Sequence, residues 1–175
     1  MALVSGCEND LKDLKKISAA EVDKPIERYT GVDVIYSDSA KVKAHLTSPL
    51  LYIYKVAKPY KEMPKGLAVT FYDANLKPSG TITADYGIQY DTQKIIVLRK
   101  NVVATNVKGE TFTSNELIWD QNTKQIHSDQ TVHVKMADGS VTEGTSFISD
   151  QNLEHWTLNQ ATGIIHVDDQ DTLKK

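Results

Sequence analysis

The amino-acid sequence predicts an all-β domain made of long antiparallel strands. From Pro25 onward, apolar and polar residues alternate, which is the pattern of a strand with one buried face. The stretch "TITADYGIQYD", which begins at Thr81, places five apolar residues in one phase, and "TVHVKM" places three. Turn signals such as "VKGE" and "DQNTK" separate these runs, and Asp138-Gly139 is a dipeptide typical of a tight hairpin. We therefore expect regularly spaced hairpins and no helix after Lys24.

Residues 1–7 end in Cys7, the one cysteine of the chain, so no internal disulfide can form. Cys7 follows small residues in "LVSGC", which resembles the end of a bacterial lipoprotein signal peptide. In such signals the chain is cut before the cysteine and a lipid is attached to it. The segment "MALVS" lacks the basic and apolar regions of a complete signal. Either the sequence is truncated and Cys7 is lipidated in the natural precursor, or the match is coincidental.

Residues 8–25 form a polar segment between Cys7 and the predicted domain. Leu11, Leu14 and Ile17 recur at every third position, which is compatible with a short helix. The alternative is a solvated tether that holds the domain away from a bilayer. The chain contains no apolar run long enough to span a membrane.

Residues 26–167 form the predicted β-domain, and this domain contains a repeat. The segment that begins at Lys94 aligns without gaps with the segment that begins at Lys124, at an offset of 30 positions. Gly109 aligns with Gly139, and the apolar phase between the turns also matches. Duplication explains both features, whereas coincidence among turn residues explains only the first. Units of strand, glycine turn, strand and polar turn bury their apolar face against neighbouring units, which predicts an elongated sandwich or roll with open ends.

The sequence shows no pattern typical of a catalytic or cofactor site. Its 5 histidines have no metal-ligand spacing, and no glycine-rich phosphate loop is present. Most carboxylates lie in turns, where they cap the backbone. Residues 168–175 form a tail whose aspartates suggest either a frayed terminus or a calcium ligand set. We expect no enzyme, no metal and no cofactor, and the net charge of -3 with mixed signs argues against a nucleic-acid surface.

Two blocks of the sequence resemble a known family. The first is "KNVVATNVKGETFTSNELIWDQNTKQIHSD" and the second is "VTEGTSFISDQ"; "KAHLTSPL", "MPKGLAVTFYD" and "TITADYGIQYD" precede them. Together they resemble LptC, a periplasm-facing component of lipopolysaccharide export, in its lipoprotein-like Bacteroidetes version. The second block of the family often has another glycine two residues after the first. Here Ser146 stands in that place, which leaves the local bulge geometry open but does not affect the expected fold.

The resemblance implies a twisted, partly open β-jellyroll of antiparallel strands, similar to LptA and to the N-terminal part of LptD. In that family, lipopolysaccharide acyl chains travel in an apolar groove between stacked jellyrolls. The inner-face residues we expect to bind lipid are Val69, Phe71, Ile82, Ala84, Ile88, Val102, Ile118, Val132, Val134 and Phe147. Trp119 is opposite in phase to Ile118, so we expect it outside the roll or at an interface.

The resemblance also implies partners at both ends of the roll. The N-terminal edge, with Tyr29, Val32 and Val34, would meet the LptF/LptG membrane subunits. The C-terminal edge, with Leu153, Trp156 and Leu158, would meet an LptA-like periplasmic protein. The protein would lie in the periplasm, anchored to the inner membrane through Cys7, because its usual relatives have a transmembrane anchor and this chain has none.

Several alternatives remain open at this stage. The inner-face residues could instead form a dry, filled core. The edge strands could instead be covered within an isolated domain. A surface β-sandwich lipoprotein that binds carbohydrate or another protein would need exposed aromatic side chains in one plane. A β-solenoid hydrolase would need paired carboxylates on one face, which the sequence does not show.

Overall fold

The fold is taken from a computed structural model, in which residue 25 and residues 27–164 are described. The expectations for Cys7, for the segment before Pro25 and for the tail of residues 168–175 lie outside the described residues. Within the described part of the chain, the regular secondary structure consists of strands and contains no helix.

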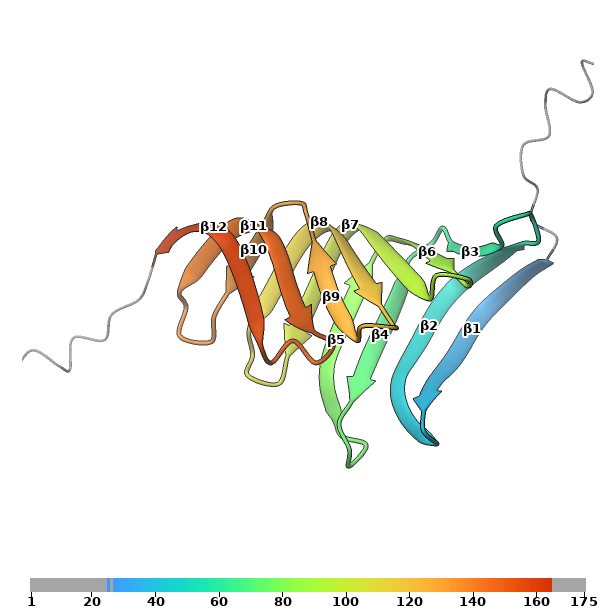
Figure 1. Ribbon diagram of the computed structural model, residues 1–175, viewed down its shortest axis with the longest axis horizontal. Coiled ribbons are helices and arrows are strands. Elements are labelled where there is room, and N and C mark those ends of the chain that lie inside the picture. The colour runs from blue at the N-terminus through green and yellow to red at the C-terminus, as the bar shows by residue number, and fades with distance from the viewer. Residues whose placement is uncertain (1–24, 26, 165–175) are drawn as a thin grey trace, which may run out of the picture.

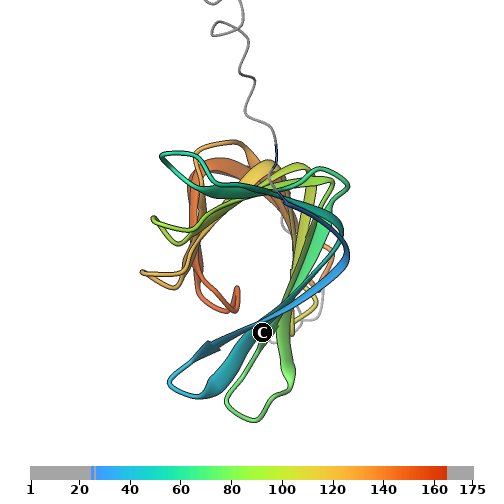
Figure 2. The same ribbon diagram turned by 90° about the vertical axis from the view of Figure 1, so that its right-hand side faces the viewer.

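Twelve antiparallel strands form a single twisted sheet (Figure 1). The strands are β1 (Glu27–Asp38), β2 (Lys41–Tyr54), β3 (Tyr60–Met63), β4 (Leu67–Tyr72), β5 (Pro78–Ala84), β6 (Tyr86–Tyr90), β7 (Ile95–Asn106), β8 (Thr111–Asp120), β9 (Gln125–Ser128), β10 (Val132–Lys135), β11 (Val141–Asp150) and β12 (Trp156–Ile164). Seen along the long axis, the sheet curls around itself into a roll (Figure 2). The predicted all-β, partly open architecture is confirmed, and no closed barrel forms.

The order of the strands leaves the roll open at both ends. The hydrogen-bonded path runs β10-β11-β9-β8-β7-β5-β4-β2-β3-β6, with β1 added to β2 and β12 added to β11. Among the described strands, β1 pairs only with β2, and β12 pairs only with β11. These two edge strands lie at opposite ends of the long axis (Figure 1). Each therefore presents one side of its backbone at an end of the molecule.

The roll has two walls, one that contains β3, β6 and β9 and one that contains β4, β5 and β10. The long strands join these walls because each of them pairs with strands of both. The first half of β7 pairs with β6 and the second half with β5. In the same way, β8 and β11 each pair with β10 over one half and with β9 over the other. A strand that changes partner midway must bend, and the bends create the roll.

Left-handed backbone conformations mark two of these bends, those of β7 and β11. Lys100 and Asn101 have φ of 64° and 50°, where the β7–β8 register shifts between Arg99 and Val102. Ser146 has φ of 53° inside β11, where the register with β12 also shifts. This bend is made by a serine in a conformation that glycine adopts more easily.

Equivalent hydrogen bonds confirm the 30-residue repeat. The Gln121 amide donates to the Lys94 carbonyl at 3.0 Å, and the Gln151 amide donates to the Lys124 carbonyl at 3.1 Å. At the opposite rim, the amides of Gly109 and Gly139 donate to the carbonyls of Asn106 and Met136, in both cases at 3.1 Å. The two units thus share the geometry of both their turns, as duplication predicts.

The bend in β11 can be tested at Ser146. We expect Ser146→Gly to raise the free energy of unfolding by about 1 kcal/mol and Ser146→Val to lower it by at least as much, because a β-branched residue strongly disfavours this φ. Urea unfolding measures both changes. Thr145→Val is the control, since Thr145 is the neighbouring residue and does not have a positive φ. Equal stabilities for the glycine and valine variants would show that the left-handed bend does not constrain the fold.

Candidate functional site: the inner face and the two edges

The middle of the roll is a packed apolar core. Eight of the expected inner-face residues point into it, and none is more than 6% exposed: Val69, Phe71, Ile82, Ala84, Val102, Val132, Val134 and Phe147. Cross-strand pairs connect them in rows; in one row, Val69 lies beside Ile82, and Phe112 lies beside Val134. The rings of Phe112 and Phe147 are 5.3 Å apart. These side chains contact one another, so an acyl chain would reach them only if the walls moved apart.

Ile118 and Ile88 do not lie on the inner face, and the expectation for both was wrong. In β8 the buried side chains are Phe112 and Ser114 before the bend, and Leu117 and Trp119 after it, so Ile118 faces outward. Ile88 faces outward because Asp85 interrupts the alternation between β5 and β6. A slip of one residue exchanges the two faces of a strand.

The same change of phase places Trp119 inside the roll. The expectation that Trp119 packs outside was wrong, because its side chain is only 3% exposed. Its ring packs edge-on against Phe71 at 4.9 Å and against Tyr36 at 5.6 Å. Trp119 therefore belongs to the core, where it joins the two walls.

At the N-terminal edge, β1 contributes a partly buried apolar stripe. Val32 and Val34 pack against the core together with Tyr36, while Tyr29 remains 48% exposed. The Tyr36 hydroxyl donates to Gln89 Oε1 at 2.7 Å. Burial raises the pKa of Tyr36 to about 12, and the nearby charge of Asp91 adds to this effect. The stripe thus continues the inner face as far as this end of the molecule.

At the C-terminal edge, β12 closes one side of an apolar hollow of about 610 Å³. Trp156 and Leu158 are partly buried against the core and line this hollow. The Trp156 indole donates to Glu110 Oε2 at 3.2 Å, and its ring meets Phe112 edge-on at 5.6 Å. Ile164 also lines the hollow and is 81% exposed. The apolar interior therefore reaches the surface at this end.

Leu153 was expected at the C-terminal edge, and that expectation was wrong. It lies in the turn between β11 and β12 and is 0% exposed. Its carbonyl accepts a hydrogen bond from Asn106 Nδ2 at 2.8 Å, and its amide donates to the Asp150 carbonyl at 3.1 Å. Leu153 anchors the turn in the core and is unavailable to a partner.

Two features of β12 favour pairing with another strand. The segment Trp156–Ile164 contains no charged residue and no proline, the side chains that usually protect an edge strand. In contrast, β1 carries Glu27, Arg28, Asp33 and Asp38. The C-terminal edge is therefore the less protected of the two.

A cluster of tyrosines on the outer face was not predicted from the sequence, because its members come from separate strands. Tyr54 stacks on Tyr60 with ring centroids 4.3 Å apart, and Tyr60 lies 6.4 Å from Tyr90. Glu62 accepts hydrogen bonds from Tyr54 at 2.9 Å and from Tyr86 at 2.8 Å. Burial and the bond to Glu62 raise the pKa of Tyr54 to about 12. The rings of Tyr54 and Tyr60 stack on each other and the ring of Tyr90 is tilted by 47° from that of Tyr60, so the three rings do not lie side by side in one plane.

Three histidines form pairs with carboxylates at the surface. His45, His133 and His155 contact Asp33, Glu143 and Asp150 at 2.6, 2.8 and 2.8 Å. Within the described ranges, no group of three or more His, Cys, Asp or Glu residues is placed to hold a metal ion. No helix in this part of the chain has the length and hydropathy needed to cross a membrane.

The described strands define the structural class of this protein: an open β-roll with an apolar interior and, at each end, an edge strand that has one partner strand. The family described as "Lipopolysaccharide-assembly, LptC-related" matches residues 11–166, and the chain belongs to this family. The protein therefore has a role in lipopolysaccharide assembly and transport at the cell envelope, which is a transport role and not a catalytic one. No significant match to a curated protein accompanies this assignment.

Attachment of the edge strand can be tested at Gly144. A Cβ added there would lie 2.5 Å from the Asn159 carbonyl oxygen and 2.9 Å from Leu158 Cγ. We expect Gly144→Ala to force β12 away from β11, so that the amides of β12 exchange faster with deuterium while those of β7 and β8 stay protected. Hydrogen exchange by mass spectrometry measures this. Glu143→Ala is the control, and unchanged protection of β12 in Gly144→Ala would contradict the argument.

The raised pKa values of two buried tyrosines predict that the folded protein becomes less stable at alkaline pH. Because the pKa values of Tyr36 and Tyr54 are about 12 in the folded protein and near 10 when unfolded, the folded state holds protons that the unfolded state releases. The free energy of unfolding should therefore fall as pH rises from about 10 to about 12.

Urea unfolding at several alkaline pH values, with tyrosinate absorbance recorded in parallel, measures this effect. Tyr36→Phe should remove part of the pH dependence, and Tyr72→Phe serves as the control substitution. A stability that does not change over this interval in the parent protein would contradict the prediction.

Proposed function

We propose that this protein is a periplasmic adaptor of the lipopolysaccharide export machine. It receives lipopolysaccharide from the inner-membrane transporter and passes it to the next β-jellyroll. The observation that carries the proposal is the presence of two pairing edges at opposite ends of one roll, each next to apolar inner-face residues. Membership of the LptC-related family supports the choice of cargo.

Transfer energies explain why such an adaptor needs an apolar interior. Each methylene exposed to water costs about 0.8 kcal/mol, so an acyl chain of about a dozen methylenes costs roughly 10 kcal/mol. Continuous apolar shelter removes most of this cost along the route. If the walls moved apart, the inner face between Val34 and Leu158 would provide apolar side chains over the length of the roll.

The two edges differ in ways that suit different partners. We propose that β12, which is uncharged and lacks proline, adds a strand of an LptA-like periplasmic protein. The charged edge β1 would pair with the jellyrolls of the LptF/LptG membrane subunits. Strand addition on both sides would make the inner faces of successive jellyrolls continuous.

Cys7 would provide the membrane anchor in this proposal. A lipid attached to Cys7 would hold the chain at the inner membrane, and the polar residues 8–24 would separate the roll from the bilayer. The length of this spacer would let β1 reach the membrane subunits.

Photo-crosslinking in living cells tests the proposed route. A photoreactive amino acid at Val34 or Leu158, which line the inner face at the two ends, should give a light-dependent adduct with lipopolysaccharide. Ile118 and His133 are matched controls, because their side chains lie on the outer face. Blotting for lipopolysaccharide on the protein measures the adducts. Equal labelling at all four positions, or labelling of the controls alone, would show that the inner face is not the route.

A further inference from the structure

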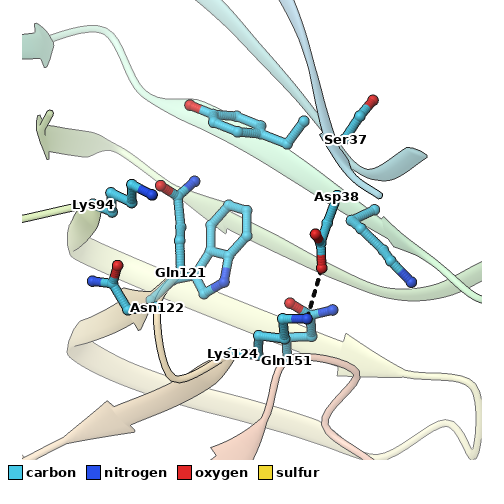
Figure 3. Close-up of a pocket in the computed structure, with 10 residues that line it drawn as sticks. Ser37, Asp38, Lys94, Gln121, Asn122, Lys124 and Gln151 are labelled. Atoms are coloured by element: carbon cyan, nitrogen blue, oxygen red, sulfur yellow. Dashed lines mark hydrogen bonds and ion pairs between the residues drawn. The ribbon is translucent and has the colours of Figure 1, made fainter. Parts of the chain in front are cut away.

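We propose that a cavity at one rim of the roll binds a phosphate group on the headgroup of the transported amphiphile. The cavity has a volume of about 450 Å³ and lies between the tip of the β1–β2 hairpin and the turns that follow β6, β8 and β11 (Figure 3). The identity of the amphiphile rests on the proposed function. The anion site itself rests on the charges and donors described below.

Three lysines provide the charge of the cavity. Lys43 comes from β2, Lys94 from the turn before β7, and Lys124 from the turn before β9. Lys94 and Lys124 occupy equivalent places in the repeat and share a left-handed backbone, with φ of 55° and 58°. The duplication therefore presents the same cation twice along the rim, on hairpins that lie roughly 10 Å apart.

One carboxylate partly neutralises these cations. Asp38 Oδ2 lies 2.7 Å from Lys124 Nζ, and both side chains are about half exposed. Hydrogen bonds from Lys124 and Ser39 lower the pKa of Asp38, and the charge of Lys43 adds to the effect. Among the residues that the structure describes, Asp38 is the only acidic one that lines the cavity, so this lining carries more positive than negative charge. The Asp38 carboxylate occupies a position that an incoming anion could take.

Amide side chains complete the lining. Gln121, Asn122 and Gln151 come from the repeated polar turns and face the same cavity (Figure 3). Asn122 Nδ2 donates to the Gln93 carbonyl at 2.7 Å, which holds its turn against the neighbouring one. Ammonium and amide groups together supply several donors, which is the set that a phosphate with its many acceptor oxygens requires.

A buried polar atom without a partner, the indole nitrogen of Trp119, belongs to a residue that lines this cavity. Of the residues that the structure describes, Trp119 Nε1 and Ser149 Oγ are the buried side-chain polar atoms that lack a hydrogen bond. Ser149 lies in the same inner row, since Ile126 pairs with both residues, but it lines a different hollow. An unpaired buried donor costs about 1–3 kcal/mol, so a bound oxygen atom that reaches it would recover part of this cost.

The position of the cavity matches an amphiphile. Trp119 borders the cavity and packs on Phe71 at 4.9 Å, so the polar rim adjoins the apolar core directly. A molecule whose acyl chains enter the inner face would place its headgroup at this rim. Phosphate on the headgroup would then meet Lys94 and Lys124.

The test compares purified lipopolysaccharide that retains its headgroup phosphates with the same preparation after enzymatic removal of phosphate. Affinities for the full chain are measured by fluorescence titration. We expect the double variant Lys94→Gln/Lys124→Gln to bind the phosphorylated form about tenfold more weakly and the dephosphorylated form as well as the parent does. Asp38→Asn should bind the phosphorylated form several-fold more tightly, because it removes the competing carboxylate. Lys135→Gln, a lysine of β10 outside this cavity, is the control.

A titration with inorganic phosphate tests the anion site separately from the assignment of the anion to a lipid headgroup. We expect millimolar phosphate to shift the indole N–H resonance of Trp119, and the double lysine variant to abolish the shift. If the resonance shifts but the chain binds neither lipopolysaccharide preparation, the anion site is supported and its assignment to a headgroup is overturned. The same result would count against the proposed function. Equal binding of both preparations by all variants, with no shift, would overturn the anion site while leaving the lipid route intact.

Discussion

The bend in each long strand is the constraint on which the rest of this structure depends. A sheet with one apolar face buries that face either by packing against a second layer or by curling onto itself. Here β2, β7, β8 and β11 each leave one wall midway and enter the other. Left-handed residues such as Asn101 and Ser146 provide the bends in β7 and β11, so the cost of a few strained backbone angles is offset by burial of Phe71, Phe112 and Phe147.

The roll is open at both ends because it is built from hairpin units that are added one after another along the sheet. Each 30-residue unit covers the exposed face of the unit before it, but no unit returns to close the circle. The first and last strands therefore keep one unpaired backbone side each among the strands described. In an isolated domain such edges favour aggregation, whereas in an assembly they provide the contact. The uncharged β12 fits the second situation, and the tight packing at Gly144 fixes that strand in place.

Alternation in the sequence was sufficient to predict the fold class, the repeat and most of the inner face. Val69 and Val132 lie inside because their strands alternate without interruption around them. Val102 lies inside because the alternation that begins directly after the bend in β7 starts with it. Ile88, Ile118 and Trp119 were misplaced because each follows a bend or break that shifts the alternation by one residue, and local periodicity does not reveal where a strand changes walls. The rim cavity and the tyrosine cluster also depend on which strands become neighbours, which alternation within one strand does not specify.

The same duplication gives the molecule two surfaces of opposite character. Strand interiors repeat apolar residues, which build the core, while the turns repeat lysine, glutamine and asparagine, which gather at one rim. An amphiphile has the same division between acyl chains and a charged headgroup. A carrier that recognised only the acyl chains would not distinguish one lipid from another, because the hydrophobic effect is non-directional. A phosphate contact at Lys94 and Lys124 would let the carrier distinguish phosphorylated lipids from others. Competition from the Asp38 carboxylate would keep this contact weak enough for the cargo to leave for the next jellyroll.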